Sequence, residues 1–180
     1  MPTAVSNGVT LARVQLTRDE PLYRDVATHR DISWKLLAAV DWMQCKARPG
    51  HSAVLGEKLG KVNPDGTIYL TRSEALHQCA EDLADLALAV YQIDLTTRLP
   101  LSVGELANVF AAFRWGGLLR VHHTSAMEFP YSVAGLTDQH VNMRWPRIAE
   151  PNCPDKPGAR FRQPFGAVPL VLGLHYPATV

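Results

Sequence analysis

The chain has 180 residues, 47% of them hydrophobic and 19% charged, which suits one globular domain with a sizeable core better than two domains. Its net charge of +1 gives no electrostatic reason to expect a nucleic acid or an anionic membrane as partner. No apolar run reaches the roughly 18 residues of a membrane span.

The N-terminal segment predicts neither a signal nor a helix. It lacks a charged start followed by an apolar stretch, so we expect no secretory signal and a cytoplasmic protein. A phage origin would offer another route to the cell wall. We predict that residues 1–20 form an extended or weakly ordered N-terminal arm, and that residues 21–180 form a single domain.

Two helices are predicted next. The first covers about residues 20–30, and Asp31 or Ser33 can cap the second. In the second, "ISWKLLAAVDWMQCKARPG" (residues 32–50), apolar residues follow the three-four spacing of one buried stripe, and a proline–glycine pair ends it. Its last turns carry three residues that a simple buried helix does not need: Asp41, Gln44 and Cys45.

Residues 51–70 change character. Glycines and the turn signal Asn63-Pro64-Asp65-Gly66 separate short β-prone runs, which predicts a small β-hairpin or an irregular lobe. Thr71 and Glu74 have capping-box spacing, in which the glutamate reaches back to the Thr71 N–H, and a long helix should follow to about residue 91.

The second half of the chain is predicted to be helix and loop. Ser102 and Glu105 form a second capping box, and the apolar helix that they open should stop at Gly116-Gly117. Thr137 can cap a short helix, and four prolines make residues 149–164 a surface loop. An apolar helix or strand closes the chain. The fold class is therefore mainly α, an α+β domain.

The cysteines favour a reducing environment. There are three, Cys45, Cys79 and Cys153, and they contain no C-x-x-C pair, which favours buried free thiols over a disulfide framework. A Cys45–Cys79 bridge stays open as an alternative, because both lie on predicted helices.

Four stretches of the chain match a series of motifs in order. The predicted helix of residues 32–50 fits the motif W-x-x-x-(A/G)-x-(I/V)-H-x-x-E, with Asp41 in place of the histidine and Gln44 in place of the glutamate. Further matches are Trp34, Ala38 and Val40 in that helix, the turn Gly56-Glu57-Lys58-Leu59-Gly60, then Ser73-Glu74-Ala75-Leu76 with Asp82-Leu83, and finally Phe113 to Gly117 with Phe129 to Ser132. Over about residues 20–135, this series resembles bacterial and phage lysozyme-like peptidoglycan hydrolases.

The resemblance implies a lysozyme-like fold, with a cleft between a β-hairpin lobe and a helical lobe. It also implies cleavage of the β-1,4 glycan of peptidoglycan. Such cleavage needs a protonated acid at the leaving oxygen and usually a second carboxylate. Gln44 stands where the family has its catalytic glutamate, and an amide cannot deliver a proton, a loss of about 10²–10⁴-fold.

Three functions therefore stay open, and whether the chain is an enzyme is undecided. It can be a glycoside hydrolase that uses another carboxylate, or a non-catalytic binding or structural protein that keeps the cleft. It can also be an intracellular biosynthetic enzyme that reuses the cleft for a small molecule. The last predicts a deep, closed, apolar pocket, whereas a glycan needs an open groove.

The candidate catalytic residues are Asp41, Gln44 and Glu57. Asp41 has apolar neighbours near the helix end, and Glu57 lies in the lobe where the superfamily often places its second carboxylate. Each has a structural alternative, such as a salt bridge or a loop position. The candidate ligand contacts are three aromatic residues that can stack on a sugar and one acid among apolar neighbours: Trp42, Trp115, Tyr131 and Glu128.

No metal or cofactor is predicted. His122 and His123 are adjacent and point in different directions on regular structure, and Asp138 with His140 lacks further ligands. We expect a saccharide or a small molecule as partner, and neither a nucleic acid nor a membrane. Residues 136–180 lie outside the resemblance, and the sequence indicates neither their role nor the oligomeric state.

Overall fold

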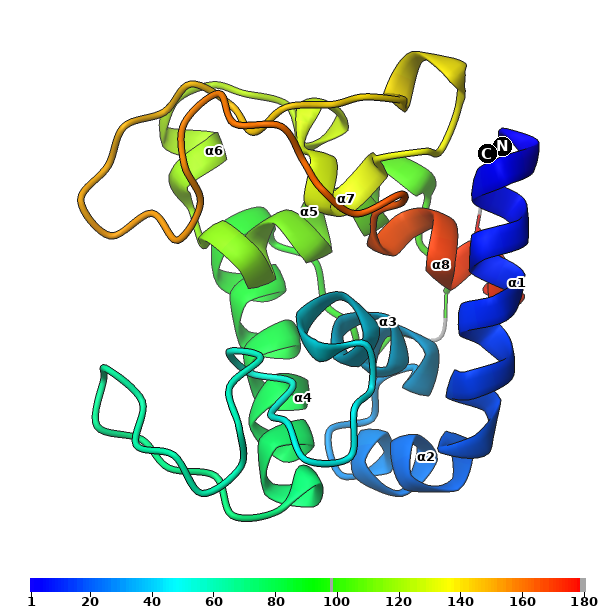
Figure 1. Ribbon diagram of the computed structural model, residues 1–180, viewed down its shortest axis with the longest axis vertical. Helices are drawn as coiled ribbons and strands as arrows, with labels where there is room; N and C mark the ends of the chain where they lie inside the picture. The colour runs from blue at the N-terminus through cyan, green and yellow to red at the C-terminus, as the bar shows by residue number, and fades with distance from the viewer. Residues whose placement is uncertain (98, 179–180) are drawn as a thin grey trace.

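The computed structural model describes residues 1–97 and 99–178 and is mainly helical (Figure 1). At its centre lies α3 (Trp34–Cys45), the helix predicted to begin near residue 32, and most of its side chains are buried. Ser33, rather than Asp31, caps it by accepting a hydrogen bond from the Lys35 N–H at 3.3 Å. The helix ends before the proline–glycine pair, because Lys46 takes a left-handed conformation with φ 53°.

Residues 1–20 are mostly helical, so the prediction of an extended arm was wrong. The segment forms α1 (Thr3–Arg18), which packs chiefly on α8 (Ala167–Gly173) near the other end of the chain (Figure 1). The distant partner stabilises a helix whose own polar sequence gave little sign of one. Its buried stripe has helical three-four spacing: Val5, Val9, Ala12 and Leu16.

The other helices complete the core. The predicted helix at 20–30 is confirmed as α2 (Glu20–Thr28), which packs on α3. Extensive contacts join α4 (Arg72–Tyr91) to α5 (Val103–Trp115), and the apolar C-terminal segment is the helix α8. Four short elements follow α5: α6 (Leu118–Val121), η1 (Ala126–Glu128), α7 (Pro130–Val133) and η2 (Asp138–His140).

The two predicted capping boxes differ in detail. Ser102 and Glu105 form the full box, each side chain bonding to the other's backbone N–H at 3.1 Å. Thr71 caps α4 as predicted, by accepting from the Glu74 N–H at 3.1 Å. Glu74, however, accepts from the Leu70 N–H at 2.9 Å instead of the Thr71 N–H. The start of α4 is thus capped one residue further out than the spacing implied.

Residues 46–71 form a loop, which we call the 46–71 loop, and the predicted β-hairpin is reduced there to two isolated antiparallel bridges. These pair His51 with Lys58 and Val62 with Ile68, and no strand is assigned across the described residues. The glycines and the proline of this region prevent a longer ladder. The mainly α class is thus confirmed.

Two further expectations concern chemistry and the membrane. All three cysteines are free, with Cys45 and Cys79 buried, so the alternative of a Cys45–Cys79 bridge is not realised. Of the helices in residues 1–97 and 99–178, none combines the length and apolar character needed to cross a membrane.

Candidate functional site

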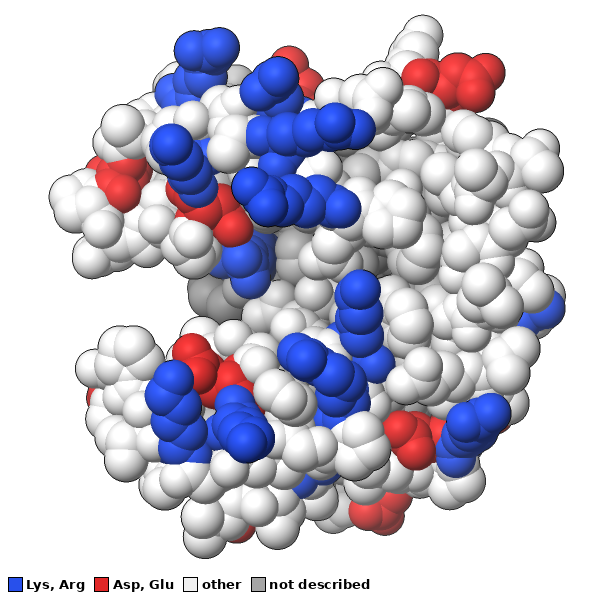
Figure 2. All heavy atoms as spheres, in the orientation of Figure 1, with Lys and Arg blue, Asp and Glu red and all other residues white. Residues whose placement is uncertain are grey.

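One side of the molecule is deeply hollowed (Figure 2). Comparison with Figure 1 shows that the 46–71 loop forms one wall of this hollow. The irregular chain of residues 142–163, which we call the wall segment, forms the other. We call the hollow the cleft. Gln44 lies between its two sides. Its side chain bonds to the 46–71 loop, α5 and α7, and it lines a small hollow with Lys46 and Arg48 of the loop and Gln163 of the wall segment.

The amide of Gln44 is held at both ends. Its Nε2 donates to the Val54 carbonyl at 2.8 Å, and its Oε1 accepts from Arg114 Nη1 at 3.1 Å and from the Tyr131 hydroxyl at 3.2 Å. Burial raises the pKa of Tyr131, so its hydroxyl stays protonated and donates. One acceptor and two donors therefore fix which way the amide points.

Arg114 is anchored in turn by Asp155 of the wall segment. Its Nη2 and Nε bind the two carboxylate oxygens at 2.7 and 3.1 Å, and Trp115 Nε1 donates to the same carboxylate at 2.7 Å. Burial alone would lower the pKa of Arg114, but the hydrogen bond and charge of Asp155 outweigh it and raise the pKa. A permanent positive charge therefore lies against the Gln44 oxygen.

The glycine-containing turn of the resemblance lies directly against Gln44. Gly56 has a positive φ of 75°, and a Cβ there would come within 2.6 Å of the Gln44 carbonyl oxygen. Glycine meets both demands, because it has no Cβ and tolerates this backbone conformation. The first two motifs of the resemblance are therefore in contact.

Asp41 lies elsewhere, in a buried ion pair. It is 0% exposed, and its Oδ2 binds Arg72 at 3.0 Å and accepts from the Tyr23 hydroxyl at 2.5 Å. The Cys45 thiol donates to its Oδ1 at 3.2 Å, and Arg72 also binds Asp19 at 2.9 Å. The prediction that Asp41 replaces the missing acid is corrected, because its carboxylate has no exposed surface to offer a ligand.

Glu57 and Glu128 also have partners of their own. Glu57 is one residue beyond Gly56 and a third exposed, and it pairs with Lys61 at 3.1 Å. Glu128 is exposed and closes a capping box around η1, accepting from the Ser125 N–H at 3.3 Å. Glu57 therefore lies beside the site, whereas Glu128 stabilises its own turn.

The predicted aromatic contacts support the site from behind. Trp115 is 7% exposed and stacks on Trp145 with centroids 5.7 Å apart, and Tyr131 is 1% exposed. Neither ring can offer a face to a sugar, so their role is to orient Asp155 and Gln44. Trp42 is half-buried and packs against the core.

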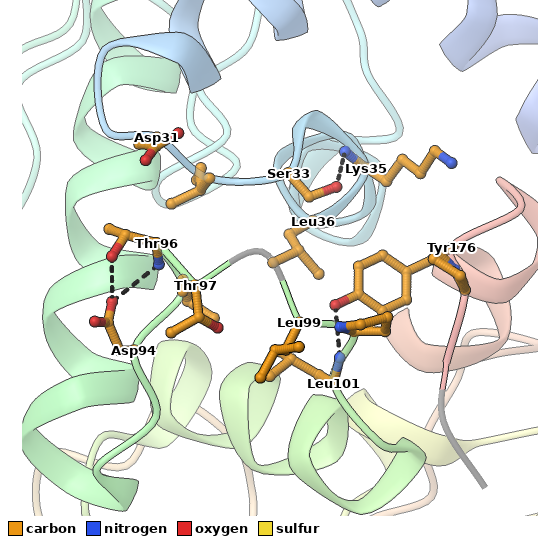
Figure 3. Close-up of a pocket in the computed structure, with 14 residues that line it drawn as sticks. Asp31, Ser33, Lys35, Leu36, Asp94, Thr96, Thr97, Leu99, Leu101 and Tyr176 are labelled. Carbon is orange, nitrogen blue, oxygen red and sulfur yellow. Dashed lines mark hydrogen bonds between the residues drawn. The ribbon is translucent and has the colours of Figure 1, made fainter.

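A separate pocket lies at the opposite end of α3 (Figure 3). It has a volume of about 290 Å³, and several of its polar groups are already engaged by neighbouring groups of the protein. Ser33 caps α3, Asp94 accepts from the Thr96 hydroxyl at 2.7 Å, and the Tyr176 hydroxyl accepts from the Leu101 N–H at 3.0 Å. None of the predicted site residues lines this pocket, so we take the cleft as the candidate site.

Sequence reasoning missed Arg114 and Asp155. Arg114 could have been noticed, because it is the lone cation on a largely apolar helix. Asp155 gave no such signal, since it lies in a proline-rich loop and is 41 residues away from Arg114.

No protein-family model matches the chain, and neither a curated protein nor a solved structure does so. The arrangement can accept and donate hydrogen bonds through fixed groups, but Gln44 itself cannot act as an acid.

Proposed function

We propose that the protein has a lysozyme-like fold whose cleft binds a glycan without cleaving it. The observation that carries the proposal is the Gln44 amide, held by Val54, Arg114 and Tyr131. An amide with both ends engaged is a rigid recognition group, and it has no proton to give to a leaving oxygen.

The carboxylates near the cleft support the loss of turnover. Glycoside hydrolysis uses two carboxyl groups about 5–10 Å apart across the scissile bond. Asp155 is engaged by Arg114 and Trp115, Asp41 is buried with Arg72, and Glu57 pairs with Lys61. Each of these carboxylates is therefore already engaged by a cationic partner within the protein.

The form of the cleft supports a glycan over a small molecule. It opens to solvent on one side of the molecule, between the 46–71 loop and the wall segment (Figure 2). A small-molecule enzyme would need a deeper and more closed site, because such ligands are usually buried over most of their surface. A groove open to solvent suits a chain that extends beyond its binding site.

Calorimetric titration with chito-oligosaccharides tests the proposal. Gln44→Leu keeps the side-chain volume but leaves Arg114 and the Val54 carbonyl without their partner. We expect an affinity loss of up to roughly tenfold, because the second N–H of the amide is lost as a donor to the glycan and one hydrogen bond contributes about 0.5–1.5 kcal/mol. Gln139→Leu, an exposed glutamine in η2, is the matched control and should bind like the wild type. No binding by the wild type would overturn the proposal.

A second variant separates a lost acid from a rebuilt site. In Gln44→Glu the new carboxylate would lie beside the Arg114 guanidinium and would be held ionised. We therefore expect this variant to give no clearing of cell-wall suspensions, like the wild type. Clearing by Gln44→Glu would mean that only the acid was lost and that the rest of the catalytic cleft is intact.

A further inference from the structure

Two stretches of the wall segment run antiparallel, and their side chains alternate. Backbone hydrogen bonds of 2.8 and 3.0 Å join them on either side of a bridge that pairs Arg144 with Arg160. Trp145 and Phe161 point inward and meet with ring centroids 5.3 Å apart. Because successive side chains in extended backbone point to opposite faces, the arginines next to them point to solvent.

Three arginines therefore share the outer face, namely Arg144, Arg160 and Arg162, all exposed. Like charges directly opposite each other in paired extended chains are destabilising. Here neutral acceptors hold two of the three: Arg144 Nη1 donates to the Gly158 carbonyl at 3.1 Å, and Arg160 Nη2 donates to Asn142 Oδ1 at 3.2 Å. The guanidinium groups are thus positioned without being neutralised.

The acids of the wall segment do not offset this charge. Asp155 is engaged in the site network, and Glu150 pairs with His122 at 3.0 Å. Arg147 and Lys156 add two more exposed cations. Within the described residues, the ion pairs of the protein involve none of these five cations. We call them the basic face, and Figure 2 shows basic side chains gathered over this wall: Arg144, Arg147, Lys156, Arg160 and Arg162.

The basic face continues toward Gln44. Arginines of the basic face and Gln163 line a surface hollow of about 630 Å³. Gln163 also lines a neighbouring hollow of about 290 Å³ together with Gln44, Lys46 and Arg48. Its Nε2 donates to the Met43 carbonyl at 3.2 Å, which fixes the wall segment to the end of α3. Positive charge therefore extends from the wall segment to the candidate site.

We propose that the glycan bound by the cleft is a polyanionic one, and that the basic face binds its carboxylate groups. The inference rests on the proposed function and names its ligand class. Arginine guanidinium groups match carboxylates in a two-pronged geometry, and unpaired cations next to a binding site attract such a ligand. The net charge of +1 gives no sign of the basic face, because the acids that balance its positive charges lie elsewhere in the molecule.

A nucleic acid fits the basic face less well. Single-stranded nucleic acids need aromatic side chains on which bases stack, in addition to positive charge. The aromatic residues of this stretch, Trp145 and Phe161, are turned toward the core, and Phe161 is 7% exposed. The outer face offers guanidinium and amide groups, which recognise charge and hydroxyl groups.

The test compares an anionic and a neutral sugar of equal length by calorimetric titration, oligogalacturonate against chito-oligosaccharide. The triple variant Arg144→Gln, Arg160→Gln and Arg162→Gln removes three charges from the basic face. The charge-matched control is Arg18→Gln, Arg24→Gln and Arg30→Gln, near α2 at the other end of the molecule (Figure 1). Circular dichroism establishes that each variant is folded.

We expect the wild type to bind oligogalacturonate more tightly than chito-oligosaccharide. The basic-face variant should lose affinity for oligogalacturonate on the order of tenfold or more and keep its affinity for the neutral sugar, while the control keeps both. Raising the salt from about 50 to about 200 mM should weaken oligogalacturonate binding roughly tenfold in the wild type and much less in the basic-face variant.

Three results would overturn the inference: equal affinity of the wild type for the two sugars, equal losses in the two triple variants, or tighter binding of duplex DNA. Binding of the neutral sugar distinguishes failure of this inference from failure of the proposed function. Wild-type binding of chito-oligosaccharide without any preference for oligogalacturonate leaves the proposed function standing alone. If only oligogalacturonate binds, the proposed function fails because the neutral sugar does not bind, and the inference that rests on it fails as well.

Discussion

At the residue scale, Asp41 and Gln44 lie three positions apart on α3 but serve opposite purposes. Asp41 faces Tyr23 and Arg72 in the core, whereas Gln44 faces Arg114 at the cleft. A buried carboxylate whose oxygens are engaged by protein groups offers no surface to a ligand. We infer that Asp41 stabilises the fold, and that Gln44 defines what the cleft can do.

Asp41→Asn should destabilise the protein without abolishing glycan binding. Arg72 would be left with only its partly exposed partner Asp19, which puts the loss near about 3 kcal/mol, at the low end for a broken buried pair. Urea unfolding measures the change, and the exposed Asp25→Asn is the control, with an expected effect of within about 0.5 kcal/mol. A stable Asp41→Asn protein that no longer binds glycan would contradict the structural role.

The buried thiol of Cys45 predicts a loss of stability at alkaline pH. Burial, aided by the charge of Asp41, raises its pKa from 9.0 to about 12. The Cys45 thiol releases its proton near pH 9 in the unfolded chain and only near pH 12 in the folded protein. Its contribution to the free energy of unfolding is therefore complete below pH 9 and falls as the pH rises through this interval.

The free energy of unfolding, measured between pH 9 and pH 12, should therefore decline as the pH rises. Cys45→Ala should reduce the slope of this decline by up to about 1.4 kcal/mol per pH unit, the value for one proton. Cys153→Ala, at the partly exposed cysteine, should leave the slope as it is. The same slope in all three proteins would show that Cys45 does not titrate in this way.

At the scale of elements, the sequence predicted helices best where local signals sufficed. Ser33, Thr71 and Ser102 cap the helices that their spacing indicated. The first helix was missed because α8, its partner, is about 150 residues away in the chain. Long-range pairing has no local signature, and the same holds for Arg114 with Asp155, on which the site depends.

The contact between α1 and α8 can be tested directly. A Cβ added at Gly173 would overlap Val9 Cγ1. Gly173→Ala should therefore destabilise the protein by about 1–3 kcal/mol, as overpacked cores do. Adding Val9→Ala should restore part of that loss, because the two changes meet at one contact.

Gly50→Ala is the control for that pair, because a Cβ there meets no atom within 4 Å. Thermal or urea unfolding of the single and double variants gives the coupling between the two positions. If the two effects simply add, the helices do not pack at this contact, and the placement of α1 would be contradicted.

At the scale of the whole molecule, the cleft brings together segments that the sequence keeps apart. Gln44 and the glycine turn, which carry two successive motifs of the resemblance, are in contact, as Gly56 against the Gln44 carbonyl shows. The opposite wall comes from residues beyond 135, where the resemblance gave no guidance. The charge of that wall also depends on which acids pair elsewhere, which only the folded chain reveals.

The most direct test of binding without turnover combines two readings on one sample. Wild-type protein is titrated with chito-oligosaccharide in a calorimeter, and the recovered sugar is then analysed by chromatography. We predict saturable binding heat and intact sugar, because the Gln44 amide can hold the glycan but cannot protonate its leaving oxygen. Shorter sugars in the recovered sample, or no binding heat at all, would contradict this account.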